Sequence, residues 1–315
     1  MGTAGLMHNR SILAKADLAL SNLQSDGGAL QPAVALKLMR ILIKEAVAMK
    51  QGTVVPLKSP KQIIDKIRFG QRILRAGVEG QALSKNDRAK PDLYQVEFDA
   101  KLFKAEIRLN NEVLEDSIER GQLRQTIMQL MAERIATDMD EVAIQSDTTN
   151  SDPALSQFDG LLKQCVSNVY DALGGTTDKT VFDAMVKMLP SEFLRNRKML
   201  RFLTSVKSEL DYRNSLAERA TVVGDKFLET DAPVVYAGIP VNDVPLFPEN
   251  LGVGSNTTNC ILTDPKNANW GIWRNIRIET DKLASEGVLI IVATLRFDVK
   301  WAHEPATVKA VNLLV

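Results

Sequence analysis

Hydrophobic residues recur every three or four positions through the middle of the chain, and this spacing predicts one long amphipathic helix. The stripe consists of Leu123, Ile127, Leu130, Met131, Ile135, Met139 and Val142. Asn110 and Asn111 precede the helix as candidate N-caps, and the pattern continues to about Gln145. At ~1.5 Å per residue such a helix spans ~50 Å. We expect it to form the spine of the molecule.

A different pattern precedes this helix. Strand-like segments cover Ile63 to Leu74 and Leu93 to Leu109, and a polar stretch with glycine, Gly77 to Pro91, separates them. These features predict a long two-stranded arm with a solvated tip. Because an isolated two-stranded ribbon is only marginally stable in water, we expect the arm to lie on a neighbouring molecule.

Shorter elements occupy both ends of the chain. Helical spacing over 10–24 and 32–48 predicts two N-terminal helices. After a polar region at 146–159, the pattern predicts a helix over Asp178 to Leu189, a strand over Leu200 to Thr204 and a helix over Ser208 to Ala220. A long strand then runs from Gly287 to Val299. This mixture predicts an α+β fold in which the chain leaves one domain for another and returns.

Composition excludes several classes of protein. The 315 residues are 45% hydrophobic, which permits one large domain or two smaller ones. Thirty-nine basic and thirty-nine acidic residues cancel, so no overall charge draws the chain to nucleic acid or to a membrane. No stretch approaches the ~20 apolar residues of a membrane span, and the first ten residues do not resemble a signal peptide. We therefore expect a globular protein in a reducing cytosol.

Candidate catalytic and ligand-binding groups have simpler structural explanations. His8 and His303 are the only histidines, and neither cysteine, Cys165 or Cys260, lies in a zinc motif. The acidic residues Glu112, Glu115, Asp116 and Glu119 suit a helix N-terminus. Gly252-Val-Gly254 and Gly174-Gly175 lack the rest of a nucleotide-binding motif. We predict no enzyme activity, no cofactor and no metal site.

Several segments, in order along the chain, resemble the major capsid proteins of tailed bacteriophages, which have the Hong Kong 97-like shell fold. Asn111 to Ile118 resembles the opening of that family's spine helix, and Phe227 to Pro248 resembles a Gly-x-Pro-Val stretch of its axial domain. Ile261 to Asp264 followed by Trp270 to Ile278 resembles its paired late strands, and Leu289 to Trp301 resembles its final long strand. The resemblance covers roughly residues 20–315.

The resemblance implies a division of the chain. Residues 1–52 would form an N-terminal arm and 53–108 an extended loop. Residues 109–159 and 286–315 would form a peripheral domain with the spine helix, and 160–285 would form the axial domain. In that family the extended loop lies over a neighbouring subunit and the axial domains meet at symmetry axes. The implied function is self-assembly, through hexamers and pentamers, into an icosahedral shell around double-stranded DNA.

The implied partners follow from this function. They are further copies of the chain, a portal, a separate scaffolding protein, a possible cement (decoration) protein, and packaged DNA through non-specific contact; no membrane is involved. Only about fifty residues precede the extended loop, which is short for a built-in scaffold. We expect assembly in the host cytoplasm and a final location in the virion capsid.

Candidate interface residues lie in the extended loop and at the tip of the axial domain. They are Lys66, Arg68, Arg72, Arg75, Lys85, Arg88, Lys90, Glu249 and Asn250. The basic residues of the loop favour contact with acidic groups of a neighbour over contact with DNA. Some family members link a loop lysine to a neighbour's asparagine; Lys85 and Lys90 lie in the right region, and no partner asparagine is identifiable.

Two other functions remain open at this point. An encapsulin-like nanocompartment shares the fold and packages enzymes in place of DNA; the two predicted N-terminal helices favour the phage interpretation. A cytosolic α/β enzyme would need a pocket with convergent polar groups. No such constellation stands out in the sequence.

Overall fold

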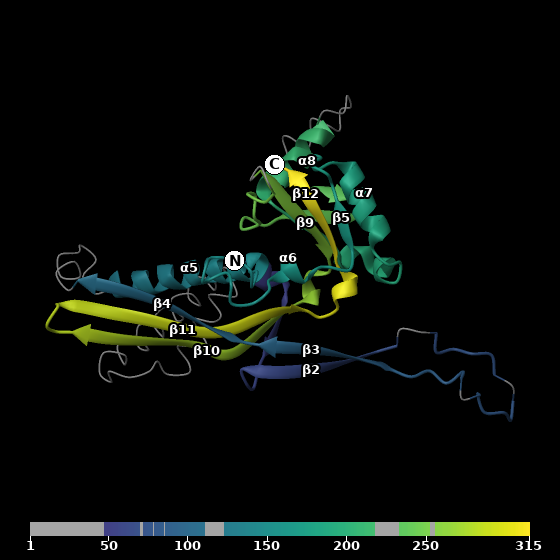
Figure 1. The fold of residues 1–315 in the computed structure, drawn as a ribbon, viewed down its shortest axis with the longest axis horizontal. Coiled ribbons are helices and arrows are strands. Elements are labelled where there is room, and N and C mark those ends of the chain that lie inside the picture. Colours follow the sequence, from purple (N-terminus) through teal and green to yellow (C-terminus); the bar gives the residue numbers. More distant parts are fainter. Residues whose placement is uncertain are drawn as a thin grey trace, which may run out of the picture.

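The computed structural model describes residues 47–69, 72–77, 79–84, 86–110, 123–217, 233–252 and 256–315. The predicted helix 10–24 and almost all of 32–48 lie outside these ranges. Figure 1 shows two regions, one built on a long sheet and one on a more compact sheet, which together we call the body. A two-stranded arm projects away from both. The α+β prediction is confirmed.

The long sheet has four strands in the order β1-β10-β11-β4. Its strands are β1 (Thr53–Pro56), β4 (Lys101–Asn110), β10 (Ala268–Leu283) and β11 (Val288–Trp301). Helix α5 (Leu123–Gln145) lies along the sheet (Figure 1). Met131, Ile135 and Met139 of α5 share one buried core with Ile291 and Phe297 of β11. The predicted end of the helix at Gln145 is confirmed, and its predicted start lies outside the described residues.

A short helix, α3 (Val47–Gln51), is joined to α5 by a buried carboxylate. Asp140 accepts hydrogen bonds from the backbone nitrogens of Ala48 at 2.9 Å and Met49 at 3.2 Å. Because two donors compensate the burial of Asp140, the start of the described chain is anchored to the spine helix.

The compact sheet has six strands in the order β5-β12-β9-β6-β8-β7. They are β5 (Val169–Asp171), β6 (Arg201–Thr204), β7 (Val235–Tyr236), β8 (Ile239–Asp243), β9 (Thr257–Thr263) and β12 (Val308–Leu314). Helices α7 (Lys179–Met188) and α8 (Val206–Ala217) belong to the same region, and α6 (Leu161–Gln164) precedes it. Phe182, Phe202 and Tyr212 are fully buried and in ring contact within its core.

Local sequence explains the elements predicted in this region. The side chain of Asp178 caps α7 by accepting from the backbone nitrogens of Thr180 and Val181. The predicted helix over Asp178 to Leu189 and strand over Leu200 to Thr204 are therefore confirmed. Helix α8 begins two residues before the predicted Ser208, and the predicted end at Ala220 lies outside the described residues.

The arm consists of β2 (Lys61–Arg68) and β3 (Asp92–Asp99), which pair in an antiparallel ribbon. The prediction of one strand from Leu93 to Leu109 is wrong, because the chain breaks at Ala100 into β3 and β4. The buried Ala100 donates its backbone nitrogen to Pro60 at 2.8 Å, which turns the chain out of the ribbon and into the long sheet. The predicted first strand is also shorter, since β2 ends at Arg68 and not at Leu74.

Two expectations about the late strands also need correction. The segments at 261–264 and 270–278 were expected to pair, but β9 lies in the compact sheet and β10 in the long sheet, separated by the short 3-10 helix η2 (Pro265–Asn267). The expected final strand is followed by β12, which pairs with β9 and β5. Residues 308–314 therefore do not group with the spine helix, because the 3-10 helix η3 (Glu304–Ala306), containing Pro305, redirects the chain.

Candidate subunit interface

The two faces of the arm ribbon have different environments. One face carries Ile64, Val96 and Phe98, which form a small core with the body. Phe98 is fully buried and lies against Gly271 of β10, where an added Cβ would come within 2.5 Å of the Phe98 ring. The sequence permits this contact only because residue 271 has no side chain. This face holds the base of the ribbon on the body.

The opposite face of the ribbon carries apolar side chains that no part of the described chain covers. Ile63 is 55% exposed, Ile67 is 69% exposed and Leu93 is 68% exposed. Ile67 and Leu93 are directly paired across the ribbon, so they form one apolar patch. Farther along the arm, Leu74 is 84% exposed. Apolar side chains grouped in this way are typical of a surface that another molecule covers.

The distal part of the arm adds positive charge to this apolar surface. Arg72, Arg88 and Lys90 are exposed. Arg75 lies 4.0 Å from Asp87, and Arg88 donates to the carbonyl of Leu83 at 3.3 Å, so these two contacts hold parts of the tip together. Lys85 lies outside the described residues.

Two predicted interface residues at the base of the arm face the body instead. Arg68 forms an ion pair with Glu192 at 2.5 Å and a hydrogen bond with His303 at 2.6 Å. Lys66 is partly buried, and desolvation lowers the pKa of its ammonium group. Their side chains point toward the face of the ribbon that packs on the chain's own body, so a neighbour would meet them less directly than it would meet Arg72.

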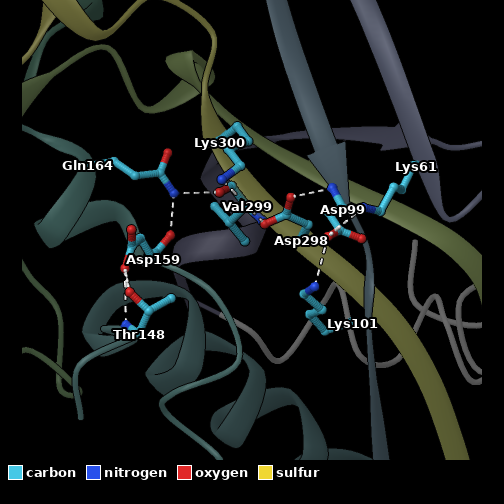
Figure 2. A network of polar contacts seen from close by, with 9 residues as sticks. All are labelled: Lys61, Asp99, Lys101, Thr148, Asp159, Gln164, Asp298, Val299 and Lys300. Atoms are coloured by element: carbon cyan, nitrogen blue, oxygen red, sulfur yellow. Dashed lines mark hydrogen bonds and ion pairs between the residues drawn. The ribbon is translucent and has the colours of Figure 1, made fainter.

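A polar network fixes the junction between arm and body (Figure 2). The buried carboxylate of Asp298 on β11 accepts from the backbone nitrogens of Asp99 and Val299, each at 2.8 Å. Asp99 in turn accepts from Lys101 at 2.8 Å, and this contact lowers the pKa of the Asp99 carboxyl. Burial raises the pKa of Asp298. The network therefore holds the point at which β3 ends and β4 begins.

The same network continues toward the spine helix. The Gln164 side chain donates to the carbonyl of Val299 at 2.7 Å and also to the carbonyl of Asp159. Thr148 donates to the Asp159 carboxylate from its backbone nitrogen and its hydroxyl, at 3.0 and 2.9 Å. The loop after α5 is thus tied to the strand that anchors the arm.

An acidic groove lies between α5 and the long sheet. Its volume is about 300 Å³, and its wall is apolar, formed by Phe103, Ala105, Ile135, Met139, Leu295 and Phe297 among others. Asp138, Glu141 and Asp152 line its edge, together with Lys104. Lys104 is paired with Glu106 at 3.0 Å and Asp138 with Arg134 at 2.8 Å. Glu141 and Asp152 therefore carry most of the uncompensated negative charge.

The two interface residues predicted at the tip of the expected axial domain, Glu249 and Asn250, have different surroundings. Glu249 forms an ion pair with Lys207 at 2.8 Å, so its charge is partly satisfied within the chain. Asn250 is exposed. Sequence reasoning identified this region but missed the acidic groove, because its residues come from α5, β4, β11 and the loop after α5 and meet only in the fold.

The cysteine thiols and the His303 ring, which could in principle react, are packed within the structure. Cys165 lies 3.0 Å from the Thr307 hydroxyl, and burial raises the pKa of Cys260 to about 12. His303 is packed between arm and body, whereas His8 lies outside the described residues. Within the described ranges there is no cluster of three or more potential metal ligands. In the same ranges, the helices are too short or too polar to cross a membrane.

Comparisons with known proteins agree on one family. The sequence model of the phage capsid family matches residues 28–312. A putative prophage capsid protein, YqbE of Bacillus subtilis strain 168, is 35% identical over 311 residues, which is 98% of this chain and 99% of that protein.

Solved structures share the fold at low sequence identity. A chain of the satellite phage P4 procapsid, which includes the size determination protein Sid, matches with a TM-score of 0.67 and 12% identity, over 99% of this chain and 98% of that one. The SrpI encapsulin of Synechococcus elongatus PCC 7942 matches with a TM-score of 0.54 and 12% identity, over 84% and 86% of the two chains. The Hong Kong 97-like fold is therefore confirmed.

Proposed function

Because the chain belongs to the phage capsid family, whose members are structural shell proteins, we propose that it is a major capsid protein of a tailed phage. It assembles through hexamers and pentamers into an icosahedral shell that encloses double-stranded DNA. The observation that carries this proposal is the exposed apolar patch of Ile67 and Leu93, with the exposed Ile63 farther along the same face, on an arm that projects from the body. A surface of this kind needs a cover that the described chain does not supply.

The cover is a second copy of the chain. The arm projects away from α5 (Figure 1), and α5 forms one wall of the acidic groove, so the arm would have to reverse direction to reach the groove of its own body. The arm tip is basic and apolar, whereas the groove is apolar with Glu141 and Asp152 at its edge. Matching charge and apolar character favour docking of one copy's arm on the next copy's groove.

Docking of this kind is head-to-tail, because an arm meets a groove and not another arm. Head-to-tail contacts repeat from copy to copy and close into rings when the rotation allows. Rings of six and five then share further contacts in the shell. Each contact can be weak, since many simultaneous contacts raise the effective concentration of every partner.

We assign the regions as follows. Residues 1–52 form the N-terminal arm and 53–108 the extended loop. The long sheet with α5 forms the peripheral domain, and the compact sheet, now including β12, forms the axial domain that surrounds the symmetry axes. The arm tip and the axial tip with Glu249 and Asn250 contact neighbours.

The wider assembly involves a portal, a separate scaffolding protein and, in some shells, a cement protein. Packaged DNA contacts the shell non-specifically, which suits a chain of zero net charge. Assembly takes place in the host cytoplasm. The alternative is an encapsulin-like shell, which the similarity to SrpI encapsulin supports at the level of fold. Purified particles that contain a protein cargo and no DNA would favour that alternative.

Charge reversal tests the arm contact. We expect Arg72→Glu with Lys90→Glu to lower the yield of particles at least about tenfold, because the weakened contact is repeated many times in each shell, and Glu141→Lys with Asp152→Lys to do the same. A chain that carries all four changes restores attraction and recovers particles. Arg197→Glu, an exposed residue elsewhere, serves as the matched control. Yields are measured by sedimentation and electron microscopy; unchanged yields from both reversed pairs would rule out this contact.

A further inference from the structure

Arg68 connects the base of the arm to the compact region through three contacts. Its guanidinium pairs with the Glu192 carboxylate at 2.5 Å and donates from Nη1 to Nε2 of His303 at 2.6 Å. It also lies over the ring of Phe193 at 5.1 Å. Glu192 and Phe193 are at the start of the 3-10 helix η1 (Phe193–Met199), and His303 follows β11. One arm residue therefore bridges two separate segments of the body.

The contact with His303 requires a particular protonation state. An arginine has no acceptor atom, so Nε2 of His303 must accept and the imidazole must be neutral. The backbone of His303 is held on both sides by Asn267, which accepts from the His303 nitrogen at 2.8 Å and donates to its carbonyl at 2.9 Å. The ring also packs edge-on against Tyr94 of β3 at 5.4 Å. The ring therefore cannot easily move away if it gains a proton.

Charged and titratable groups surround His303 on every element that packs against it. Lys66 and Arg68 face it from β2, Tyr94 from β3, Glu192 from the segment before η1 and Glu304 from η3. Burial lowers the pKa of His303 below its usual value near 6.5, and Arg68 lowers it further, while Glu192 and Glu304 act in the opposite direction. The pKa of His303 is lowered overall, so the ring stays neutral at neutral pH.

We propose that Arg68, Glu192 and His303 form a pH-sensitive latch, which holds the base of the arm against the compact region and loosens when His303 gains a proton. A charged imidazole and the guanidinium are both donors, so their hydrogen bond is lost and two positive charges are left in contact. Of the two polar contacts that Arg68 makes with the body, only the ion pair with Glu192 then remains. Opening the latch would change the direction in which the arm leaves the body and so its contact with a neighbour; this consequence rests on the proposed function, whereas the latch itself does not.

The sign of the pH dependence follows from the lowered pKa. The latch is closed above about pH 6.5, where His303 is neutral in both closed and open forms. As the pH falls below this value, the open form binds the proton more readily than the closed form. The ratio of closed to open arms therefore falls by up to about tenfold per pH unit until His303 is charged in both forms.

A distance measurement within one chain tests the latch. Spin labels are attached to Ser84→Cys in the arm and Lys198→Cys in the compact region of the full chain; both positions are exposed, and the buried Cys165 and Cys260 do not compete for label. Distances are measured by pulsed electron resonance from pH 8 to pH 5 on unassembled subunits. We expect one narrow distribution at pH 8 and a second, longer or broader one that grows below pH 6.5.

Variants separate His303 from other acid-sensitive groups. His303→Gln keeps an acceptor that does not titrate, so its distribution stays narrow across the whole range. His303→Lys carries a fixed charge and gives the open distribution at pH 8. Arg72→Gln, an exposed arm arginine outside the latch, behaves like wild type. A wild-type distribution that does not change with pH, or a His303→Gln chain that changes as wild type does, would overturn the latch; neither result bears on whether the chain forms shells.

Discussion

The arm ribbon and the compact six-stranded sheet share the same alternation of side chains, but the alternating apolar face is buried in the sheet and partly exposed in the ribbon. In the compact sheet, Phe202 points into a core where the ring of Phe182 lies 4.5 Å away. In the ribbon, Ile67 alternates in the same way and is 69% exposed. Alternation therefore predicts which side chains share a face, but the neighbouring layer decides whether that face is buried. The compact sheet buries its apolar side chains within the chain, whereas the ribbon leaves Ile67 exposed for the neighbouring copy proposed above.

Truncation of a core residue should produce the largest effect on folding. We expect Phe202→Ala to lower the free energy of unfolding by about 3–5 kcal/mol, because it leaves a cavity beside Phe182 and Tyr236. Phe69→Ala in the arm is the matched control and should cost less than about 1 kcal/mol. Chemical denaturation of unassembled subunits measures both. Equal losses would remove the distinction between the two regions.

An intermediate effect is expected at the junction of arm and body. Asp298→Ala removes the acceptor of two backbone N–H groups, from Asp99 and Val299, and should cost about 1–3 kcal/mol. Hydrogen exchange at Asp99 should become faster, whereas exchange in the compact sheet should not. Asp298→Asn keeps one acceptor oxygen and should lose less. Uniform acceleration across both regions would show that Asp298 does not act locally.

The apolar patch of the arm should matter little for folding and greatly for assembly. We expect Ile67→Ser to change the free energy of unfolding by less than about 0.5 kcal/mol, because the side chain is already in water. The same change should reduce particle yield, since it weakens a surface that a neighbour covers. Thermal unfolding and sedimentation are measured on the same preparation. Normal particle yield would contradict a role for this face in assembly.

The smallest effect concerns the thiols. Cys260 is buried with its pKa raised to about 12, and burial also raises the pKa of Cys165, so neither is a thiolate at pH 8. We expect neither cysteine to react with a thiol reagent in the folded chain within the time of labelling. Both should react after denaturation. Rapid reaction of Cys260 in the native state would mean that the compact core opens more readily than its packing indicates.

Sequence patterns predicted the elements whose signals are local. The long helix ends at Gln145 as expected, and the helix from Asp178 and the long strand after Gly287 were also predicted, because periodicity involves neighbours in the chain. The break at Ala100 was not readable, since its cause is a contact with Pro60, forty residues earlier. The pairing of β12 was missed for a related reason: strand partners are chosen by tertiary packing.

In the candidate interface, too, features carried by neighbouring residues were predicted, and features that depend on tertiary contacts were not. The basic and apolar character of the arm was evident from Arg72, Lys90 and their neighbours, because they are close in sequence. The acidic groove was not, since Phe103, Met139 and Asp152 meet only after folding. Arg68 was expected to meet a neighbour, yet it contacts Glu192 and His303 of its own chain. Charge alone therefore identified the arm but could not say which of its faces turns outward.

Electron cryomicroscopy of assembled particles would show whether one copy covers the arm of the next, because it locates the arm of each copy relative to its neighbours. We expect closed icosahedral shells in which the Ile67 and Leu93 face is covered by an adjacent copy and the arm tip reaches that copy's groove beside Glu141. Shells in which this face remains in solvent, with the groove occupied by something other than an arm, would contradict this expectation.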